Sequence, residues 1–395
     1  MTSSKTRVWA EINTDALAHN ISVLRECAGE ADIIAIVKAN AYGHDVSIAV
    51  PYLAELGIGR FGVATADEGL LVRRLAPSAG IMILGHVHES LYPEIISAGI
   101  IPAVCSTRAA AALSEYAARA GVTASCNIKV NTGMNRVGLN SVSELKSVLS
   151  LEHLKVRELF THFSCADSAS PDDLEYTKRQ QKLFLQYAET ARQYRPQIKL
   201  HSQNSAGTLL HRDFATDMDF VRTGIAMYGC CPGGGGAAAG CKLCGAYRDD
   251  KKGGCKLRPV MTVKSLIAQV WEPLTDSGVS YGRTYTTREG DRLCVVTAGY
   301  GDGFTRRLSD SGYCVTARGS LLPVAGRVTM DQTVVLGSSE CEVGDVVTLY
   351  GGEETPGTRF DTAAALAGTI SYELLCGISS RVPRVKIHKH SVKKI

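Results

Sequence analysis

The sequence has no long hydrophobic run: no stretch of about 18 apolar residues occurs in its 395 residues, which argues against a transmembrane helix. Its first residues, "MTSSKTRVWAEINTDAL", have neither the apolar core nor the cleavage site of a secretory leader. We therefore expect a cytoplasmic protein with no membrane partner.

An excess of charge of one sign is also lacking. The 43 Lys and Arg residues nearly balance the 39 Asp and Glu residues, which leaves a net charge of only +4. The one basic cluster is the tail "RVPRVKIHKHSVKKI", residues 381–395, which we interpret as a solvated terminus. We therefore expect no nucleic-acid partner.

Short apolar runs alternate with helical stretches in the first half of the chain. The predicted strands are residues 33–37, 60–64, 81–85, 101–105, 124–130, 156–162, 199–202 and 220–228. Thr65, Ser106 and Ser141 each precede a helical pattern, as N-cap residues do. This α/β pattern predicts a (β/α)8 TIM-like barrel over residues 1–229, with a doubly wound open sheet as the alternative.

The composition changes after Tyr228. Residues 230–256 are rich in Gly, Ala and Cys without an apolar period, which predicts a flexible insertion. Residues 257–395 show short β runs with a helical pattern only in "RFDTAAALAGTI", and predict a mostly β C-terminal domain. The run "VWAEINTDAL" predicts one more strand followed by a helix. The strand lies within residues 1–12 and would pair either with the barrel or with the C-terminal domain.

Cysteine is plentiful, with 13 residues. Most lie singly in apolar runs and indicate small buried side chains in a reducing compartment, as for Cys105, Cys126, Cys294 and Cys314. The C-x2-C pair Cys241 and Cys244, with Cys255 and either Cys231 or Cys230, would make a structural zinc site. No standard zinc module has this spacing, so we prefer a loop with incidental cysteines.

Polar residues follow the predicted strands at the ends where a barrel carries its functional groups. They are Lys38, Asn40, Tyr42 and His44 after the first strand, Lys129 and Arg136 after the fifth, His162 and Asp167 after the sixth, His201, Asn204 and Ser205 after the seventh, and Arg222, Gly224 and Tyr228 at the eighth. These side chains are far apart in sequence, yet they would share one rim.

Lys38 is costly at the end of a buried strand unless its amine does chemistry. Such an amine forms a Schiff base with an aldehyde, and pyridoxal phosphate offers an aldehyde, a pyridine ring and a phosphate. Ser205 and the backbone N–H groups near Gly224 and Ile225 suit the phosphate, and Tyr42 adds a hydroxyl. Each residue alone has an ordinary structural interpretation, and only their joint occurrence favours the cofactor.

The segment "AIVKANAYGHD" resembles the cofactor-lysine motif of the alanine racemase family, the fold-type III pyridoxal phosphate enzymes. Other segments resemble the family's further motifs in the family's order: "KVNTGMNRVG", "THFSCAD", "HSQNSAG", "FVRTGIAMYG", "VSYGRTY", "GYGDGFTRR", "GRVTMDQ" and "SYELLCGISSRVPR". They extend from Lys38 to Arg384, and only the Cys/Gly insertion has no counterpart.

The resemblance implies a racemase that interconverts L-alanine and D-alanine with pyridoxal 5'-phosphate, in a head-to-tail homodimer with shared active sites. It implies that Lys38 carries the cofactor and is one catalytic base, and that Tyr281 of the second subunit is the other. It implies that the cofactor is bound by nine residues: Lys38, Tyr42, His162, Asn204, Ser205, Arg222, Gly224, Ile225 and Tyr372. It implies that Arg136 and Met330 bind the substrate carboxylate and that Lys129 is carbamylated. It places five residues at the substrate entryway: Asp167, Tyr300, Arg306, Arg327 and Ile370.

Amines and phenols titrate near pH 10, so both bases need lowered pKa values, and we expect positive charge on Arg136 and His162 to supply this. Arg222 would keep the pyridine nitrogen unprotonated, because a guanidinium stays charged. Asn131 and Asn135 depart from the family's pattern beside Arg136, which puts the carbamylation of Lys129 in doubt.

Other functions remain open on these residues. One is a racemase of the same mechanism that prefers serine or another small amino acid, although Tyr372 would restrict the space beside the substrate side chain. A decarboxylase is disfavoured, because Tyr281 provides a base that decarboxylation does not need. A non-catalytic pyridoxal phosphate carrier would resemble the barrel alone. The resemblance implies D-alanine supply for peptidoglycan.

Overall fold

The computed structural model describes residues 6–233, 248–249, 254–255, 257–352 and 356–388. The chain divides into two compact units, which we describe separately: residues 21–42 with 46–227, and residues 1–20 with 43–45 and 228–395.

The first unit is built on an eight-stranded parallel sheet with the order β8-β7-β6-β5-β4-β3-β2-β9. Its strands are β2 (Asp32–Ile36), β3 (Arg60–Val63), β4 (Gly80–Ile83), β5 (Ile100–Val104), β6 (Ala124–Lys129), β7 (Leu154–Phe160), β8 (Lys199–His201) and β9 (Phe220–Thr223). The sheet closes between its edge strands, because Asp219 N donates to Leu200 O at 2.9 Å and Arg222 N donates to Gln203 O at 3.0 Å. The predicted TIM-like barrel is thus confirmed, and an open doubly wound sheet is excluded.

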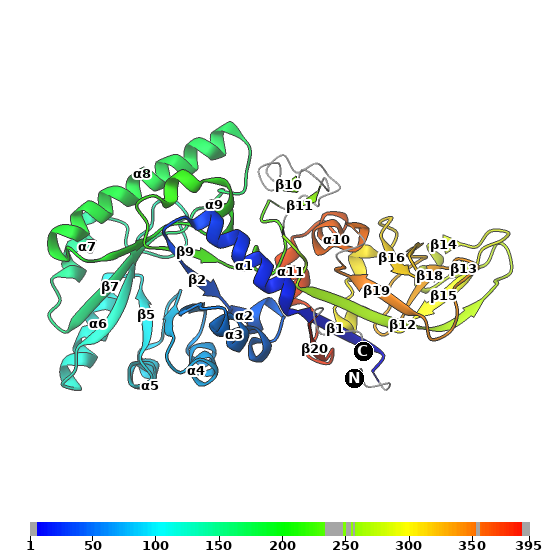
Figure 1. The fold of residues 1–395 in the computed structure, drawn as a ribbon, viewed down its shortest axis with the longest axis horizontal. Coiled ribbons are helices and arrows are strands. Elements are labelled where there is room, and N and C mark those ends of the chain that lie inside the picture. Colours follow the sequence, from blue (N-terminus) through cyan, green and yellow to red (C-terminus); the bar gives the residue numbers. More distant parts are fainter. Residues whose placement is uncertain (1–5, 234–247, 250–253, 256, 353–355, 389–395) are drawn as a thin grey trace, which may run out of the picture. The chain divides into compact units, whose positions relative to one another are not determined.

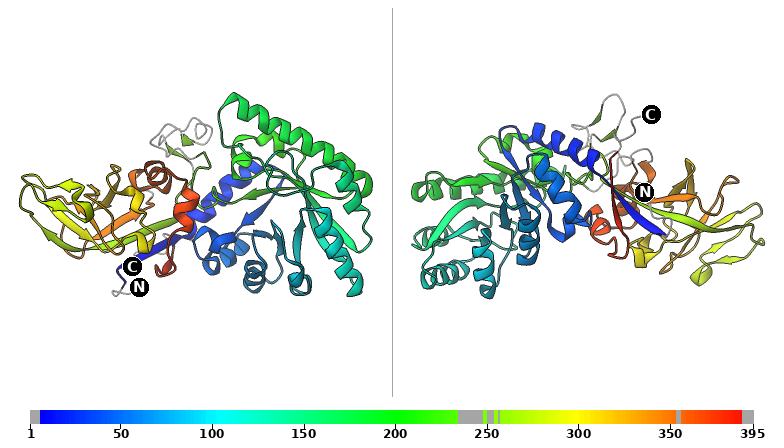
Figure 2. Two further views of the ribbon diagram at one scale, coloured as in Figure 1. Left: turned by 180° about the vertical axis from the view of Figure 1, so that it is seen from behind. Right: turned by 60° about the horizontal axis from the view of Figure 1, so that its bottom comes forward.

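Helices follow the strands and lie on the outside of the sheet (Figures 1 and 2). They are α1 (Thr14–Ala28), which crosses the boundary between the units, α3 (Val46–Glu55), α4 (Ala66–Leu75), α5 (Tyr92–Ser97), α6 (Thr107–Arg119), α7 (Val142–Leu149), α8 (Pro171–Tyr194) and α9 (Ser205–Leu210). The segment α2 (Lys38–Tyr42), directly after β2, is a left-handed turn. The three predicted N-caps are confirmed: the side chains of Thr65, Ser106 and Ser141 accept hydrogen bonds from the first turns of α4, α6 and α7. Among the described residues, no helix has both the length and the apolar character to cross a bilayer.

The second unit is mostly β, as predicted. Its strands are β1 (Val8–Asn13), β10 (Arg248–Asp249), β11 (Gly254–Cys255), β12 (Met261–Trp271), β13 (Gly278–Val279), β14 (Tyr285–Thr286), β15 (Leu293–Val296), β16 (Cys314–Ala317), β17 (Ser320–Pro323), β18 (Thr333–Leu336), β19 (Val346–Tyr350) and β20 (Arg384–Ile387). The long strand β12 pairs with β1, β15 and β19, and β1 also pairs with β20. The N-terminal strand, for which the sequence left two possibilities, therefore belongs to the β unit. Aromatic rings of Phe304, Tyr313 and Tyr350 pack together in this unit's core.

One local expectation needs correction. The sequence predicted one helix late in the chain, whereas the structure has two, α10 (Phe360–Leu366) and α11 (Ser371–Cys376). The second was missed because six residues are too short for a helical period to emerge. Within the predicted flexible insertion, β10 and β11 pair in antiparallel fashion.

The zinc alternative depends on Cys241 and Cys244, which lie outside the described residues. Cys230 and Cys231 are buried. The described part of the chain has no group of three or more His, Cys, Asp or Glu side chains placed to hold a metal ion.

Candidate active site

Lys38 directly follows the buried strand β2 and begins a left-handed turn. Ala39, Asn40, Ala41 and Tyr42 all have φ values between 51° and 55°. Left-handed backbone costs about 1–2 kcal/mol for each non-glycine residue, so the surroundings must stabilise this turn. Glu68, at the start of α4, accepts the N–H of Ala39 at 2.7 Å, and the Asn40 side chain accepts the N–H of Val46 at 2.8 Å. The half-buried Lys38 is therefore held on a well-defined backbone.

Arg222, on β9, is 3% exposed, and its side chain makes five hydrogen bonds. Its Nη1 donates to His201 Nδ1 at 2.7 Å and to His201 O at 3.0 Å. Its Nη2 donates to Thr161 O at 2.6 Å and to Ser202 O at 2.9 Å, with His162 Nδ1 at 3.4 Å. Within the described residues the Nε–H makes no hydrogen bond. Burial lowers the pKa of Arg222 to about 9, which still leaves the guanidinium charged at neutral pH.

Behind Arg222 lies a buried polar chain that the sequence did not reveal. Glu158, on β7 and 1% exposed, accepts from His201 Nε2 at 3.1 Å and from Asn127 Nδ2 at 2.7 Å, and forms an ion pair with Arg60. Burial lowers the pKa of His201 well below its usual value, and Arg222 and Arg60 lower it further. His201 is therefore neutral, with its proton on Nε2 toward Glu158 and its Nδ1 lone pair toward Arg222. The signal in the sequence was the position of Glu158, directly before the apolar pair Leu159 and Phe160 at the end of the strand.

The predicted rim residues of the barrel share one electrostatic environment. Burial lowers the pKa of Lys129 to about 8; Cys105 opposes this, while Arg136, Arg222 and Lys38 add to it. The pKa of His162 falls well below its usual value through burial and through the charges of Arg222, Lys129, Arg136 and Lys38.

This environment corrects one expectation. His162 was expected to offer positive charge to a catalytic base, but an imidazole that is largely desolvated and flanked by several cations is neutral at physiological pH. It acts instead as an acceptor for Arg222.

A cradle of small groups lies between β8, α9 and β9. Ser205 is 5% exposed. Its Oγ accepts hydrogen bonds from the N–H of Gly224 at 2.9 Å and from the N–H of Ala226 at 3.4 Å. Asn204 caps α9 by accepting the N–H of Gly207 at 2.9 Å. A Cβ on Gly224 would come within 2.6 Å of the Tyr42 hydroxyl oxygen, so a larger residue there would displace the Tyr42 side chain. The structure thus brings Tyr42, Asn204, Ser205 and the backbone at Gly224 and Ile225 together.

Arg136 and Asp167 lie on exposed loops of the same unit. The Asn131 side chain organises the first loop: its Oδ1 accepts the N–H groups of Gly133 and Asn135, and its Nδ2 donates to Asn135 and Asn140. The two asparagines that depart from the family's pattern therefore bond to each other at 2.9 Å and fix the turn before Arg136.

The remaining predicted residues lie in the β unit, where backbone contacts join several of their loops. Ser280 Oγ donates to Arg327 O at 2.6 Å, and a Cβ on Gly282 would meet Arg327 Nη1 at 2.8 Å, so the loop of Tyr281 packs on that of Arg327. Tyr300 N donates to Thr329 O at 3.0 Å, and Gly301 N donates to Met330 O at 2.9 Å.

Several of these side chains are strongly exposed: Tyr281 is 73%, Met330 53%, Ile370 53% and Tyr300 43% exposed. Arg306 lies on an exposed 3-10 turn, and Tyr372, in α11, is half-buried. Exposed aromatic and apolar side chains of this kind are typical of surfaces that meet another molecule.

The barrel rim fits pyridoxal phosphate on the chemistry of its own groups. The buried side chain of Arg222 offers an Nε–H that has no partner among the described residues, which suits a pyridine nitrogen. The small-residue cradle suits a phosphate. Lys38 offers an amine at the same rim, within the electrostatic reach of Lys129.

A (β/α)8 barrel with a lysine at the end of its first strand and a β unit defines the class of fold-type III enzymes. Residues 12–232 match the family description "Alanine racemase, N-terminal domain", and residues 260–386 match "Alanine racemase, C-terminal domain". The chain belongs to the alanine racemase family.

Individual relatives agree with this. The chain is 36% identical to the alanine racemase of Desulfosudis oleivorans, over 95% of this chain and 96% of the relative. The alanine racemase structure from Clostridium difficile 630 superposes with a TM-score of 0.84 at 30% identity, covering 98% of this chain and 97% of the other. The alanine racemase structure from Bartonella henselae, described with covalently bound pyridoxal phosphate, gives a TM-score of 0.82 at 25% identity, covering 97% and 100%.

Proposed function

We propose that this protein interconverts L-alanine and D-alanine, with pyridoxal 5'-phosphate held covalently on Lys38. The observation that supports this most is the cluster of positive charge at the rim of the barrel. The charges of Lys38, Arg136 and Arg222 lower the pKa values of both Lys129 and His162. Arg222 is also buried and held by five hydrogen-bond acceptors. Membership of the alanine racemase family supports the same activity.

In this proposal, each residue of the cofactor site has a defined role in binding. Arg222 would donate its Nε–H to the pyridine nitrogen and keep it unprotonated. The hydroxyls of Tyr42, Ser205 and Tyr372 and the N–H groups of Gly224 and Ile225 would hold the phosphate. Asn204 would fix the position of Ser205 through its cap of α9, and His162 would hold Arg222 in its orientation. When bound, the cofactor makes the Cα–H of the amino acid acidic by delocalising the negative charge that proton loss leaves.

Two bases, one on each face of the substrate, allow the Cα proton to be removed from either enantiomer. We assign the D-face proton to Lys38 Nζ and the L-face proton to Tyr281 Oη of a second copy of the chain, in a homodimer with shared sites. The 73% exposure of Tyr281 suits a residue that acts in a partner's site. The neighbouring cations, Arg136 among them, would favour the neutral amine of Lys38.

The substrate contacts follow from the same frame. Arg136 and the backbone of Met330 would bind the carboxylate, and carbamylated Lys129 would pair with Arg136. Asp167, Tyr300, Arg306, Arg327 and Ile370 would line the entryway. Tyr372 would restrict the space beside the substrate side chain, which favours alanine over serine. We further propose that the enzyme works in the cytoplasm and supplies D-alanine for peptidoglycan. We divide its domains at 1–229, 230–256 and 257–395, except that the strand within residues 1–12 pairs in the β unit.

The test is the formation of D-alanine from L-alanine by the purified wild type, Tyr281→Phe and Lys38→Ala. We expect activity in the wild type and a loss of more than about a hundredfold in each variant, as is usual when a general base is removed. Tyr281→Phe should keep the cofactor, whereas Lys38→Ala should not hold it covalently. A wild type that holds the cofactor but forms no D-alanine would favour a carrier and contradict the proposal.

A further inference from the structure

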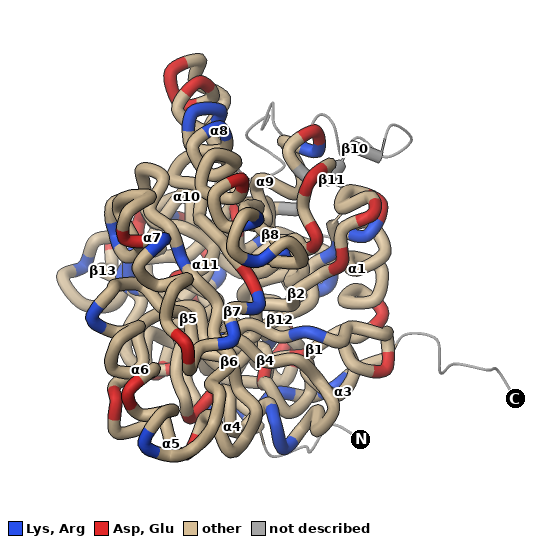
Figure 3. The backbone as a smooth tube through the Cα atoms, turned by 90° about the vertical axis from the view of Figure 1, so that its left-hand side faces the viewer, with Lys and Arg blue, Asp and Glu red and all other residues tan. Residues whose placement is uncertain are grey.

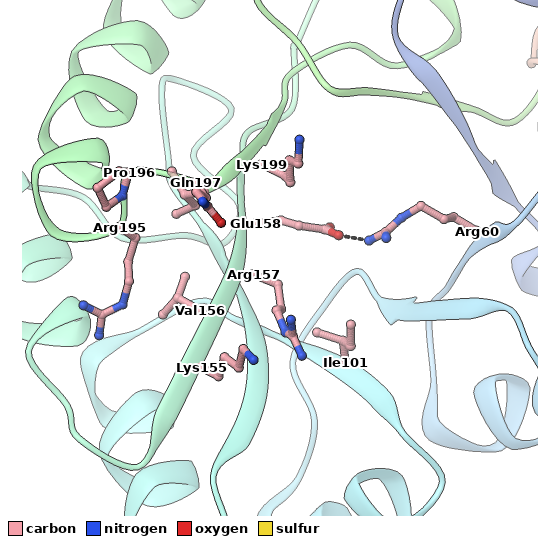
Figure 4. A pocket seen from close by; sticks show the side chains of 11 residues that line it. Arg60, Ile101, Lys155, Val156, Arg157, Glu158, Arg195, Pro196, Gln197 and Lys199 are labelled. Carbon is pink, nitrogen blue, oxygen red and sulfur yellow. Dashed lines mark ion pairs between the residues drawn. The ribbon is translucent and has the colours of Figure 1, made fainter.

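A charged cavity of the barrel unit lies at the opposite end from Lys38. It has a volume of about 610 Å³ and opens at the amino ends of the strands, where Arg60 begins β3 and Lys199 begins β8 (Figure 4). Ligand pockets commonly have volumes of about 300–1,000 Å³. None of the residues proposed above for racemisation lines this cavity.

Its polar lining is strongly basic. Arg60, Lys155, Arg157, Arg195 and Lys199 surround it, against the single carboxylate of Glu158. Lys and Arg positions, blue in Figure 3, lie along β7 and β8. A like-charge effect is already visible at Arg60: burial lowers its pKa, Asp32 partly offsets this, and the guanidinium of Arg157 lowers it again.

Two of the five cations are already neutralised by carboxylates. Arg60 is ion-paired with the buried Glu158, and Lys199 Nζ lies 2.7 Å from Asp219 Oδ1. Lys155, Arg157 and Arg195 form no ion pair within the part of the chain that the structure describes. Arg157 bonds through Nε to the Ser125 hydroxyl at 3.2 Å, and Arg195 bonds to the backbone carbonyls of Tyr194 and Leu149. These bonds orient both guanidinium groups but leave their charge uncompensated.

An apolar surface lies beside these charges. Val156 and Ile198 are 7% and 5% exposed, and Ile101 and Pro196 complete this part of the lining. An inorganic anion would use only the charged part of the cavity. A ligand with both a phosphate and an organic body would use the whole of it.

We propose that this cavity, lined by Lys155, Arg157 and Arg195 beside Val156 and Ile198, binds a small organic phosphate that carries two or three negative charges. The phosphate oxygens accept hydrogen bonds from Arg157 and Arg195, whose planar guanidinium groups suit phosphate geometry, and Lys155 adds a point charge. The organic part lies on Val156 and Ile198. The site is separate from the cofactor phosphate site at the other end of the barrel.

The site also has a physical route to the reaction centre. Arg60 at the cavity pairs with Glu158, which accepts from His201, which in turn accepts from Arg222. An anion beside Arg60 weakens its hold on Glu158 and so changes the charge felt at His201. This consequence rests on the proposed function, whereas binding itself does not.

The test is calorimetric titration of the cofactor-loaded protein with adenosine diphosphate and, separately, with pyrophosphate at low ionic strength. The loaded protein is used because its own cofactor blocks the phosphate site near Ser205. We expect saturable one-site binding, tighter for adenosine diphosphate than for pyrophosphate, and at least about tenfold weaker in Lys155→Gln/Arg157→Gln, a loss that corresponds to about 1.4 kcal/mol.

The matched control is Lys178→Gln/Lys182→Gln, which removes the same charge from the exposed face of α8, outside the cavity. It should bind within about twofold of the wild type, since it changes only the long-range field. Absence of binding in the wild type, or equal weakening in both double variants, would overturn the site. Equal affinity for the two anions would overturn the role of the apolar surface. Unchanged circular dichroism in the variants establishes that they are folded, and D-alanine formation reports separately on the proposed function.

Discussion

Arg222 connects several groups of the candidate site. It is buried, it keeps its charge at a pKa of about 9, and its two Nη atoms are bonded to β8 and to the segment after β7. His201 is held in one tautomer by Glu158 on one side and Arg222 on the other. The orientation of the Arg222 guanidinium therefore depends on the carboxylate of Glu158, which acts through His201.

Glu158→Gln tests this dependence. The amide keeps the size of the carboxylate but removes its charge, so Arg60 loses its ion-pair partner and His201 loses its charged acceptor. We expect kcat/KM for D-alanine formation to fall by about tenfold, which corresponds to about 1.4 kcal/mol. The control Glu152→Gln, on an exposed loop just before β7, should have no effect. Equal rates in the two variants would show that Arg222 is oriented without Glu158.

Lys129 gives a prediction with a defined pH range. Because burial lowers its pKa to about 8, roughly a tenth of the amine is neutral at pH 7 and more than half is neutral above pH 8. The neutral amine adds to carbon dioxide, with loss of one proton, to give a carbamate whose negative charge suits Arg136. Carbon-13 NMR with labelled carbon dioxide should show a carbamate signal that grows from pH 7 to pH 9.

The same spectrum of Lys129→Gln is the control, and the signal should be absent from it. A signal that persists in the variant, or that does not change with pH, would contradict the assignment to Lys129.

The turn after β2 is the element on which the site depends most. It has left-handed backbone at Ala39, Asn40, Ala41 and Tyr42, and Glu68 of α4 holds its start. Glu68 also completes the capping box with Thr65, so one carboxylate serves both the helix and the turn.

Glu68→Gln should therefore destabilise the protein by about 1.5–3 kcal/mol, the usual contribution of hydrogen bonds to a charged group. It should also slow the uptake of cofactor by the apoprotein, because Lys38 starts the affected turn. Urea unfolding and the return of visible absorbance measure the two effects. The neighbouring Asp67→Asn, exposed in the same helical turn, is the control and should show a clearly smaller loss. Equal losses in both variants would mean that the turn does not depend on Glu68.

Much at the level of elements was predictable from the sequence. The eight barrel strands, the three N-caps and the change to a β unit all follow from apolar periodicity and capping residues. The left-handed turn was not predictable, because only Asn40 is of a type that favours positive φ, whereas alanine and tyrosine disfavour it. The Glu158–His201 contact depends on the register between β7 and β8, which no periodicity specifies.

For the whole molecule, the proposed shared site makes a prediction about mixed dimers. Lys38→Ala and Tyr281→Phe should each be inactive alone, since each lacks one base in both sites. Mixed after refolding or by co-expression, half of the dimers are heterodimers by chance, and each heterodimer has one site with both bases intact. Activity should return to roughly a quarter of the wild type, as the symmetry of a twofold dimer requires. No recovery, with heterodimers confirmed by mass spectrometry, would place both bases in one chain.

The most direct test of the central claim is borohydride reduction of the purified protein followed by peptide mass spectrometry. We predict that reduction removes the visible absorbance and leaves one phosphopyridoxyl group per chain, on the peptide that contains Lys38. A label on Lys129 instead, or an unlabelled protein that still forms D-alanine, would contradict the account.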